Sequence, residues 1–158
     1  MSRDRQIHAI VQGIVASDTT VKQELGRRFA YCLGLTPGSL GGDGGIDGSG
    51  TFGDLNIYFQ SKLSRHLLDA SFAADLIGNL VIHEADIGVM LAGIGYTDGF
   101  YDRAQKALKS NKWKINCQIH LLTLEDIFSK NQNFLETIQH LPPLQSLSRE
   151  AWKVYESS

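Results

Sequence analysis

The segment from Ile87 to Ala92 has the sequence IGVMLA and carries no polar side chain. The run is uninterrupted and ends before Gly93 and Gly95. This is typical of a strand buried on both faces, because a strand with one solvent-exposed face alternates apolar and polar residues. Such a strand needs helices on both sides of its sheet. The run therefore predicts an α/β fold with the sheet between helices.

Helical and strand patterns alternate around this run. Apolar residues at helical spacing predict helices, and β-branched or aromatic runs predict strands. Strands are expected at Leu55–Lys62, Ile87–Ala92 and Ile115–Leu122. Helices are expected near Arg5–Val15, Val21–Leu33, Leu67–Ile82, Gly99–Leu108 and Leu124–Ile138, the last with Thr123 as N-cap. No element is predicted in the polar tail after Pro143, and the glycine-dense segment 41–53 cannot be helical.

Length and composition indicate one globular domain. A chain of 158 residues can bury a core without disulfides or metal. We expect an N-terminal helix in residues 1–17, a core in 18–140 and a C-terminal tail in 141–158. No window is apolar for long enough to cross a membrane, and no secretory signal follows Met1, so a cytoplasmic location is expected. Cys32 and Cys117 show no metal-ligand spacing.

The most informative chemistry lies in GGDGGIDG, Gly41 to Gly48, and in the strand that follows it. Twelve residues separate Asp47 from Gln60, Ser61 and Lys62, which end the predicted strand. Alternate side chains of a strand share a face, so Gln60 and Lys62 point to the same side. If the loop carries Asp47 onto the neighbouring strand, a carboxylate, an amide and an ammonium converge. Oxygen ligands of this kind suit Mg²⁺, which retains several waters and binds substrate phosphates.

This arrangement resembles the active-site signature of the PD-(D/E)XK nucleases, and most closely their Mrr-like restriction endonuclease branch. The resemblance rests on G-x-D-x-G-I-D followed by an apolar strand that ends in Q-x-K, and on the later run from Gly88 to Ala104. It implies a restriction-endonuclease-like core with a mixed central β-sheet flanked by helices. It also implies that Asp47, Gln60, Lys62 and Glu24 are catalytic. Glu24, on the preceding helix, would join Asp47 and Gln60 as a metal ligand.

Each of these residues also has a simpler structural explanation. Glu24 can form an ordinary helical ion pair with Arg28, four residues later. Gln60 and Lys62 could be solvated residues at the end of a strand, although their shared face and their distance from the loop favour a site. Asp43 is expected to form a turn and is left out of catalysis.

Basic residues concentrate in one stretch, although the formal net charge is −2 and the pI is near 6.2. Arg103, Lys106 and Lys109 are spaced to share a helix face, and Lys112 and Lys114 follow. A local basic surface could contact DNA phosphates, and we therefore assign DNA binding to Arg103, Lys106 and Lys109. Taken alone, the spacing also fits a solvated helix face.

The sequence therefore predicts an endodeoxyribonuclease that depends on Mg²⁺, with Mn²⁺ as a possible substitute. Its substrate would be double-stranded DNA. Because double-strand cleavage needs two sites, a homodimer or a higher symmetric homo-oligomer is expected. A second hypothesis is a catalytically inactive DNA-binding or assembly module that keeps the nuclease fold. A third, weaker hypothesis is a nucleotide-binding α/β domain.

Overall fold

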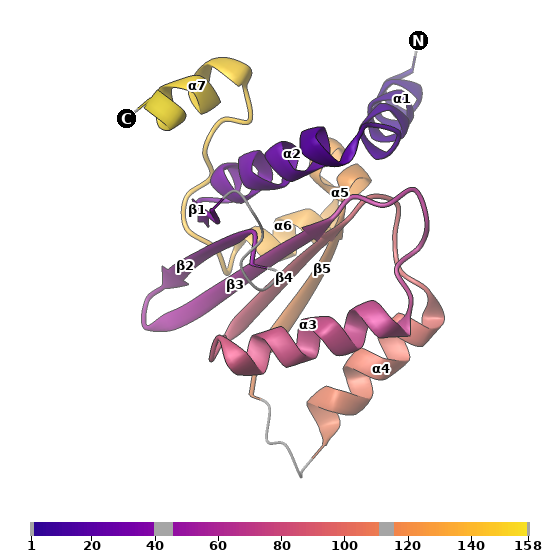
Figure 1. The fold of residues 1–158 in the computed structure, drawn as a ribbon, viewed down its shortest axis with the longest axis vertical. Helices are drawn as coiled ribbons and strands as arrows, with labels where there is room; N and C mark the ends of the chain where they lie inside the picture. Colours follow the sequence, from indigo (N-terminus) through magenta and orange to yellow (C-terminus); the bar gives the residue numbers. More distant parts are fainter. Residues whose placement is uncertain (1, 40–45, 111–115, 158) are drawn as a thin grey trace.

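The computed structural model describes residues 2–39, 46–110 and 116–157 and contains one five-stranded mixed sheet (Figure 1). The strand order follows the sequence, and β1, β2 and β3 are antiparallel neighbours whereas β3, β4 and β5 are parallel. The strands are β1 (Thr36–Pro37), β2 (Gly48–Phe52), β3 (Leu55–Lys62), β4 (Ile87–Ala92) and β5 (Gln118–Thr123). The chain is therefore an α/β protein with a mixed sheet flanked by helices.

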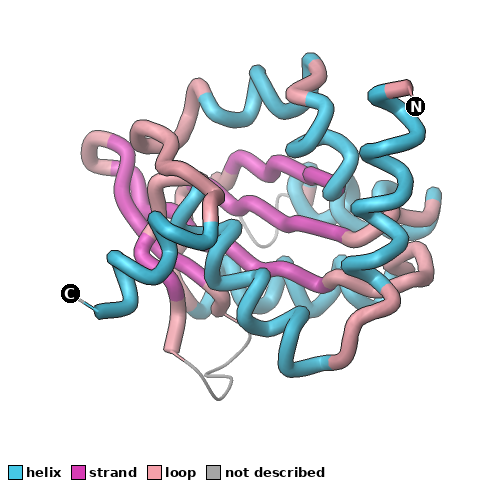
Figure 2. Tube along the Cα trace, turned by 90° about the horizontal axis from the view of Figure 1, so that it is seen from above, coloured by secondary structure: helices cyan, strands magenta, loops and turns pink. Residues whose placement is uncertain are grey.

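Helices cover both faces of the sheet, as the view from above shows (Figure 2). One apolar cluster joins the sheet to α1, α2, α5 and α6, and the other joins it to α3 and α4. The helices are α1 (Arg3–Val15), α2 (Thr19–Cys32), α3 (Ala70–Ile82), α4 (Asp98–Lys109), α5 (Leu124–Ser129), α6 (Gln132–Ile138) and α7 (Arg149–Ser157).

The central strand β4 is buried along its whole length. Val89 and Leu91 face the cluster that contains α1 and α2, whereas Met90 and Ala92 face α3 and α4. Burying a side chain of the size of leucine contributes roughly 1.5–3 kcal/mol, so these residues hold both helical layers on the sheet. The prediction that this run is a buried strand is confirmed.

The β2–β3 hairpin lies close against α2. Gly48 pairs with Phe59 of β3, and a Cβ atom on Gly48 would lie 2.7 Å from the Cβ of Ala30. Glycine is therefore required here by packing against the helix. The hairpin turns at Gly53, whose φ of 60° favours a residue without a side chain.

Two sequence predictions need correction in the C-terminal third. The single helix expected over Leu124–Ile138 is two helices, because Lys130 adopts a left-handed conformation and Asn131 caps α6. Thr123 caps α5, as predicted, and forms a capping box with Asp126. The tail, for which no element was predicted, contains α7, which packs on α2 through the buried Trp152.

Other boundaries agree more closely with the patterns in the sequence. The strands predicted at Leu55–Lys62 and Ile87–Ala92 are confirmed. The helix expected from Leu67 begins at Ala70, because Asp69 caps it. No helix in the described part of the chain is both long and apolar enough to span a membrane.

Gly93, directly after β4, lies where the layers are packed tightly. A Cβ at this position would overlap the backbone oxygen of Ser64 and lie 2.7 Å from Cγ1 of Val15. We expect Gly93→Ala to lower the free energy of unfolding by roughly 1–3 kcal/mol. As a control, Gly13→Ala in α1 has open space around its Cβ and should raise it by up to about 1 kcal/mol. Urea denaturation measures both values, and equal effects of the two substitutions would contradict this account.

Candidate active site

Backbone hydrogen bonds fix Asp47 directly before β2. Its N–H donates to the carbonyl oxygen of Phe59 at 2.9 Å, and its own carbonyl oxygen accepts from the N–H of Gly38 at 2.8 Å. Gly48 pairs with Phe59, so one further step along the register brings Asp47 beside Gln60. The loop and β3 therefore meet where the sequence predicted.

The carboxylate of Asp47 is held by the next residue of β3. Its Oδ2 accepts from the backbone N–H of Ser61 at 2.7 Å and from the Ser61 hydroxyl at 3.3 Å. Ser61 fits because the facing residue on α2 is Gly26, where a Cβ would overlap the serine hydroxyl. Within the described ranges no hydrogen bond uses the other oxygen, Oδ1, which leaves it available to a ligand.

Burial raises the pKa of Asp47 above that of an ordinary aspartate, because water is partly removed from its charged form. The hydrogen bonds from Ser61 and the positive charge of Lys62 lower the pKa, but they offset only part of this effect. The carboxylate is thus held in a place where its charge lacks full compensation. A cation beside it would supply the missing compensation.

Gln60 is oriented by a chain of polar groups on the α3 face of the sheet. The hydroxyl of Tyr58 donates to Oε1 of Gln60 at 3.0 Å and is itself hydrogen-bonded by the side chain of Asn79. Burial, together with the negative charge of Asp47, raises the pKa of Tyr58 well above its usual range, so the hydroxyl stays protonated as a donor. Neither Tyr58 nor Asn79 was predicted to belong to the site.

Lys62 lies at the end of β3, on the same face as Gln60. Its ammonium is 5.8 Å from the centre of the Phe72 ring in α3, within range of a cation–π contact. The side chain is exposed, and it forms no ion pair with a carboxylate in the described ranges. Lys62 is therefore free to approach an anionic ligand.

Asp47, Gln60 and Lys62 line one pocket of about 390 Å³. The opposite wall comes from α2, and the segment after β3 completes the rim. The other lining residues are Thr19, Lys22, Gln23, Ser61, Leu63 and Ser64. Lys22 and Lys62 outnumber the single carboxylate, so the pocket favours an anion such as a phosphodiester. Lys22 and Gln23 were not predicted to belong to the site, because only their position on the preceding helix pointed to them.

Glu24, predicted as a metal ligand, does not line this pocket. Its carboxylate accepts a hydrogen bond from the indole N–H of Trp152 and lies 3.7 Å from Arg27. The expected partner Arg28 instead donates to the carbonyl oxygen of Leu147. The structure thus brings together three of the four predicted catalytic residues, and Gln23 is the neighbour of Glu24 that faces them. Among the described residues, no group of three or more His, Cys, Asp or Glu could hold a metal.

The predicted DNA-binding residues Arg103, Lys106 and Lys109 do not line this pocket either. The helix α4 begins beside the carboxyl end of β4 and must return to the amino end of β5, so Lys106 and Lys109, in its last turn, lie toward the opposite edge of the sheet. All three side chains are exposed. Asp43, Lys112 and Lys114, also singled out from the sequence, lie outside the described residues.

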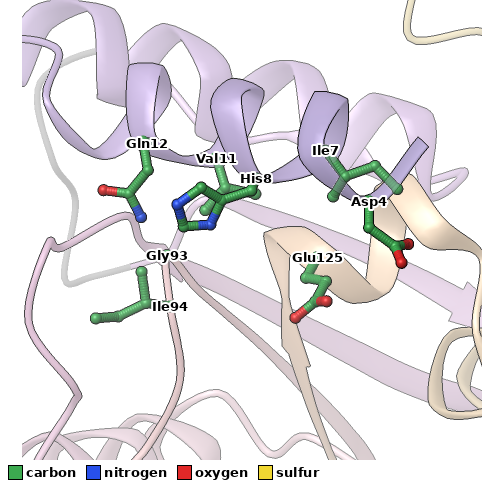
Figure 3. Close-up of a pocket in the computed structure, with 8 residues that line it drawn as sticks. All are labelled: Asp4, Ile7, His8, Val11, Gln12, Gly93, Ile94 and Glu125. Carbon is green, nitrogen blue, oxygen red and sulfur yellow. The ribbon is translucent and has the colours of Figure 1, made fainter. Parts of the chain in front are cut away.

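A second pocket, of about 290 Å³, lies at the carboxyl ends of β4 and β5 (Figure 3). In this close-up His8 and Gln12 of α1 point toward Ile94, and Asp4 and Glu125 contribute carboxylates from α1 and α5. The two carboxylates would repel a phosphate. Charge therefore distinguishes the two pockets, and the pocket with Lys22 and Lys62 is the better site for an anionic substrate.

The raised pKa of Asp47 has a consequence for stability. The folded state takes up a proton at higher pH than the unfolded chain, so the charged carboxylate costs stability at neutral pH, and this cost disappears below the pKa of the unfolded chain. In a chelating buffer, Asp47→Asn should raise the free energy of unfolding near neutral pH, and the gain should shrink as the pH falls and vanish below about 4. Urea denaturation across this range measures the difference. A variant that is destabilised at neutral pH would refute the assignment.

Comparisons with known proteins do not identify a family for this chain: no protein-family model, curated protein or solved structure matches it.

Proposed function

We propose that this chain is a metal-dependent endonuclease that hydrolyses phosphodiester bonds in DNA. The observation that supports this most is the common pocket of Asp47, Gln60 and Lys62 at the end of β3. One carboxylate, one amide and one ammonium are the groups needed to hold a hard cation and a phosphate together.

The topology supports the same proposal. A helix, an antiparallel hairpin, a crossover helix and a parallel strand follow one another as α2, β2–β3, α3 and β4. This is the order expected of a restriction-endonuclease-like core, in which the acidic residue precedes one hairpin strand and the lysine ends the next. The proposal therefore includes that fold.

The donor atoms fit Mg²⁺, with Mn²⁺ as a possible substitute. Asp47 Oδ1 and Gln60 Oε1 are both oxygen ligands, and Mg²⁺ commonly binds through one or two protein oxygens while substrate phosphates and waters fill its remaining positions. Asp47 and Gln60 would hold the cation, which would supply polarisation of the scissile phosphate and a lower pKa for a coordinated water. Glu24 contributes no donor atom to this pocket, so we leave it out of the proposed ligand set.

The side chains of this protein have separate roles in the proposed reaction. Ser61 holds Oδ2 of Asp47, and Oδ1 accepts no hydrogen bond from the described residues. Lys62 would stabilise the negative charge that develops on the phosphoryl oxygens in the transition state. Lys22, across the pocket, would bind a neighbouring phosphate and orient the strand.

The proposed substrate is double-stranded DNA, and the proposed enzyme is a homodimer, since two copies of the site would be needed to cut both strands. DNA contact would be local to the pocket, because the net charge of −2 gives the chain no general attraction for phosphates.

Cleavage of supercoiled plasmid in Mg²⁺ tests the proposal directly. We expect Asp47→Asn and Lys62→Ala to reduce the rate by roughly 10²-fold or more, because each removes charge needed in the transition state. Lys109→Ala, which also removes one exposed lysine but lies outside the pocket, is the matched control and should retain the parent rate. If the parent binds DNA with steep salt dependence but does not cleave it in Mg²⁺ or Mn²⁺, the inactive DNA-binding module replaces this proposal.

The hydrogen bond from Tyr58 to Gln60 gives a second prediction. Tyr58→Phe removes the donor that orients Gln60 Oε1, so the Mg²⁺ concentration for half-maximal cleavage should rise by roughly 10-fold, the size expected when a partner of a metal ligand is lost. The rate at saturating Mg²⁺ should change less. Tyr101→Phe, at an exposed position on α4, is the control and should leave the Mg²⁺ dependence unchanged. A fall in rate at saturating metal, with no change in metal dependence, would assign Tyr58 a purely structural role.

A further inference from the structure

A groove of about 620 Å³ runs between the C-terminal halves of α3 and α4. The two helices lie side by side on one face of the sheet (Figure 1). The residues that line the groove are separate from those of the Asp47 pocket. The groove is therefore a second surface, distinct from the Asp47 pocket.

The α3 wall of the groove is an aliphatic stripe that faces solvent. Ile77, Val81 and Ile82 line it, and Val81 and Ile82 are 53% and 74% exposed. The outer face of a helix in a soluble protein normally carries polar side chains. Adjacent exposed aliphatic residues of this kind are typical of a contact surface.

Gly78 lines the groove without a side chain, and together with Ala74 and Ala107 it is called the floor of the groove. No atom lies within 4 Å of the position that its Cβ would occupy, so packing does not require glycine there. Glycine inside a helix costs about 1 kcal/mol relative to alanine. Ala74 and Ala107 continue the floor with small side chains. The shape thus leaves room for the side chains of another element.

The α4 wall is basic. Arg103 and Lys106 line the groove, and Lys109 is exposed one turn further along. Asp75 and Asp102 are exposed on the same helices, but neither they nor any other described carboxylate lines the groove. The groove therefore presents an apolar wall and floor beside a positively charged wall.

These features together select the kind of occupant. The apolar floor gives a phosphate backbone nothing to bind, and a second copy of this face would offer no lining carboxylate to Arg103 and Lys106. The stretch from Ala74 to Ile82 spans about 12 Å at 1.5 Å per residue, which matches roughly two turns of a helix. We propose that the groove docks an amphipathic helix of a partner protein, with an apolar stripe over Gly78 and Asp or Glu residues against Arg103 and Lys106.

A displayed library of amphipathic helical peptides tests this. Its members share one apolar stripe and carry acidic, neutral or basic flanks in equal abundance, and the bait is the full chain. We expect acidic flanks to be enriched. Binding should weaken with salt, because the basic wall is exposed.

Variants then locate the binding site of an enriched peptide. Gly78→Leu places its Cβ where no atom lies within 4 Å, and the rest of its side chain should occupy the groove. We expect binding to weaken at least tenfold while the thermal midpoint is kept. Gly13→Leu, in open space on α1, is the matched control and should bind as the parent does. The double variant Arg103→Glu, Lys106→Glu should weaken binding by about tenfold, whereas Lys153→Glu on α7 should not.

Several results would overturn the proposal. These are the absence of enrichment, enrichment of neutral or basic flanks, and equal affinity of a peptide for the parent and Gly78→Leu. Self-association that Gly78→Leu abolishes would assign the groove to a second copy of this chain. Groove-dependent binding to phosphatidylglycerol vesicles would assign it to an anionic lipid surface. DNA cleavage is not part of these readouts, so they do not depend on the proposed nuclease function.

Discussion

Both faces of β4 are buried, and the rest of the architecture follows from this. Helices must cover each side of the sheet, so the chain crosses from β3 to β4 through α3 and from β4 to β5 through α4. These parallel connections bring the carboxyl ends of three strands to one edge, where ligands commonly bind in α/β proteins. The candidate site lies at this edge because β3 ends there.

The hairpin adds the acidic group to this edge. Residues before β2 run antiparallel to β3, so Asp47 meets the end of β3 although it lies outside the strand. Two glycines permit the close approach: Gly48 accommodates Ala30, and Gly26 accommodates Ser61. The structure assigns Gly48 a packing role.

Local patterns were sufficient to predict β3 and β4, because strand residues of marked hydrophobicity leave few alternatives. The convergence of Asp47 with Gln60 and Lys62 was also predictable from spacing and from the alternation of side chains along a strand. The placement of Glu24 was not. Glu24 is bound by Trp152 of α7, and nothing in the sequence indicated that the C-terminal tail packs on α2. The break at Lys130 depends on a single left-handed residue, which periodicity does not detect.

Basic residues that are close in sequence on α4 are not the ones that line the Asp47 pocket. Arg103, Lys106 and Lys109 share one face of α4, which suggested a phosphate-binding surface, but the return of α4 across the sheet carries the last two away from the pocket. The positive charge that lines the Asp47 pocket comes from Lys22 and Lys62, which lie forty residues apart in sequence. At a distance beyond about 8–10 Å, salt screens an exposed charge, so two nearby lysines influence a phosphate more than three remote basic residues. The Asp47 pocket and the basic helix α4 are therefore two separate surfaces, and we expect them to bind different ligands.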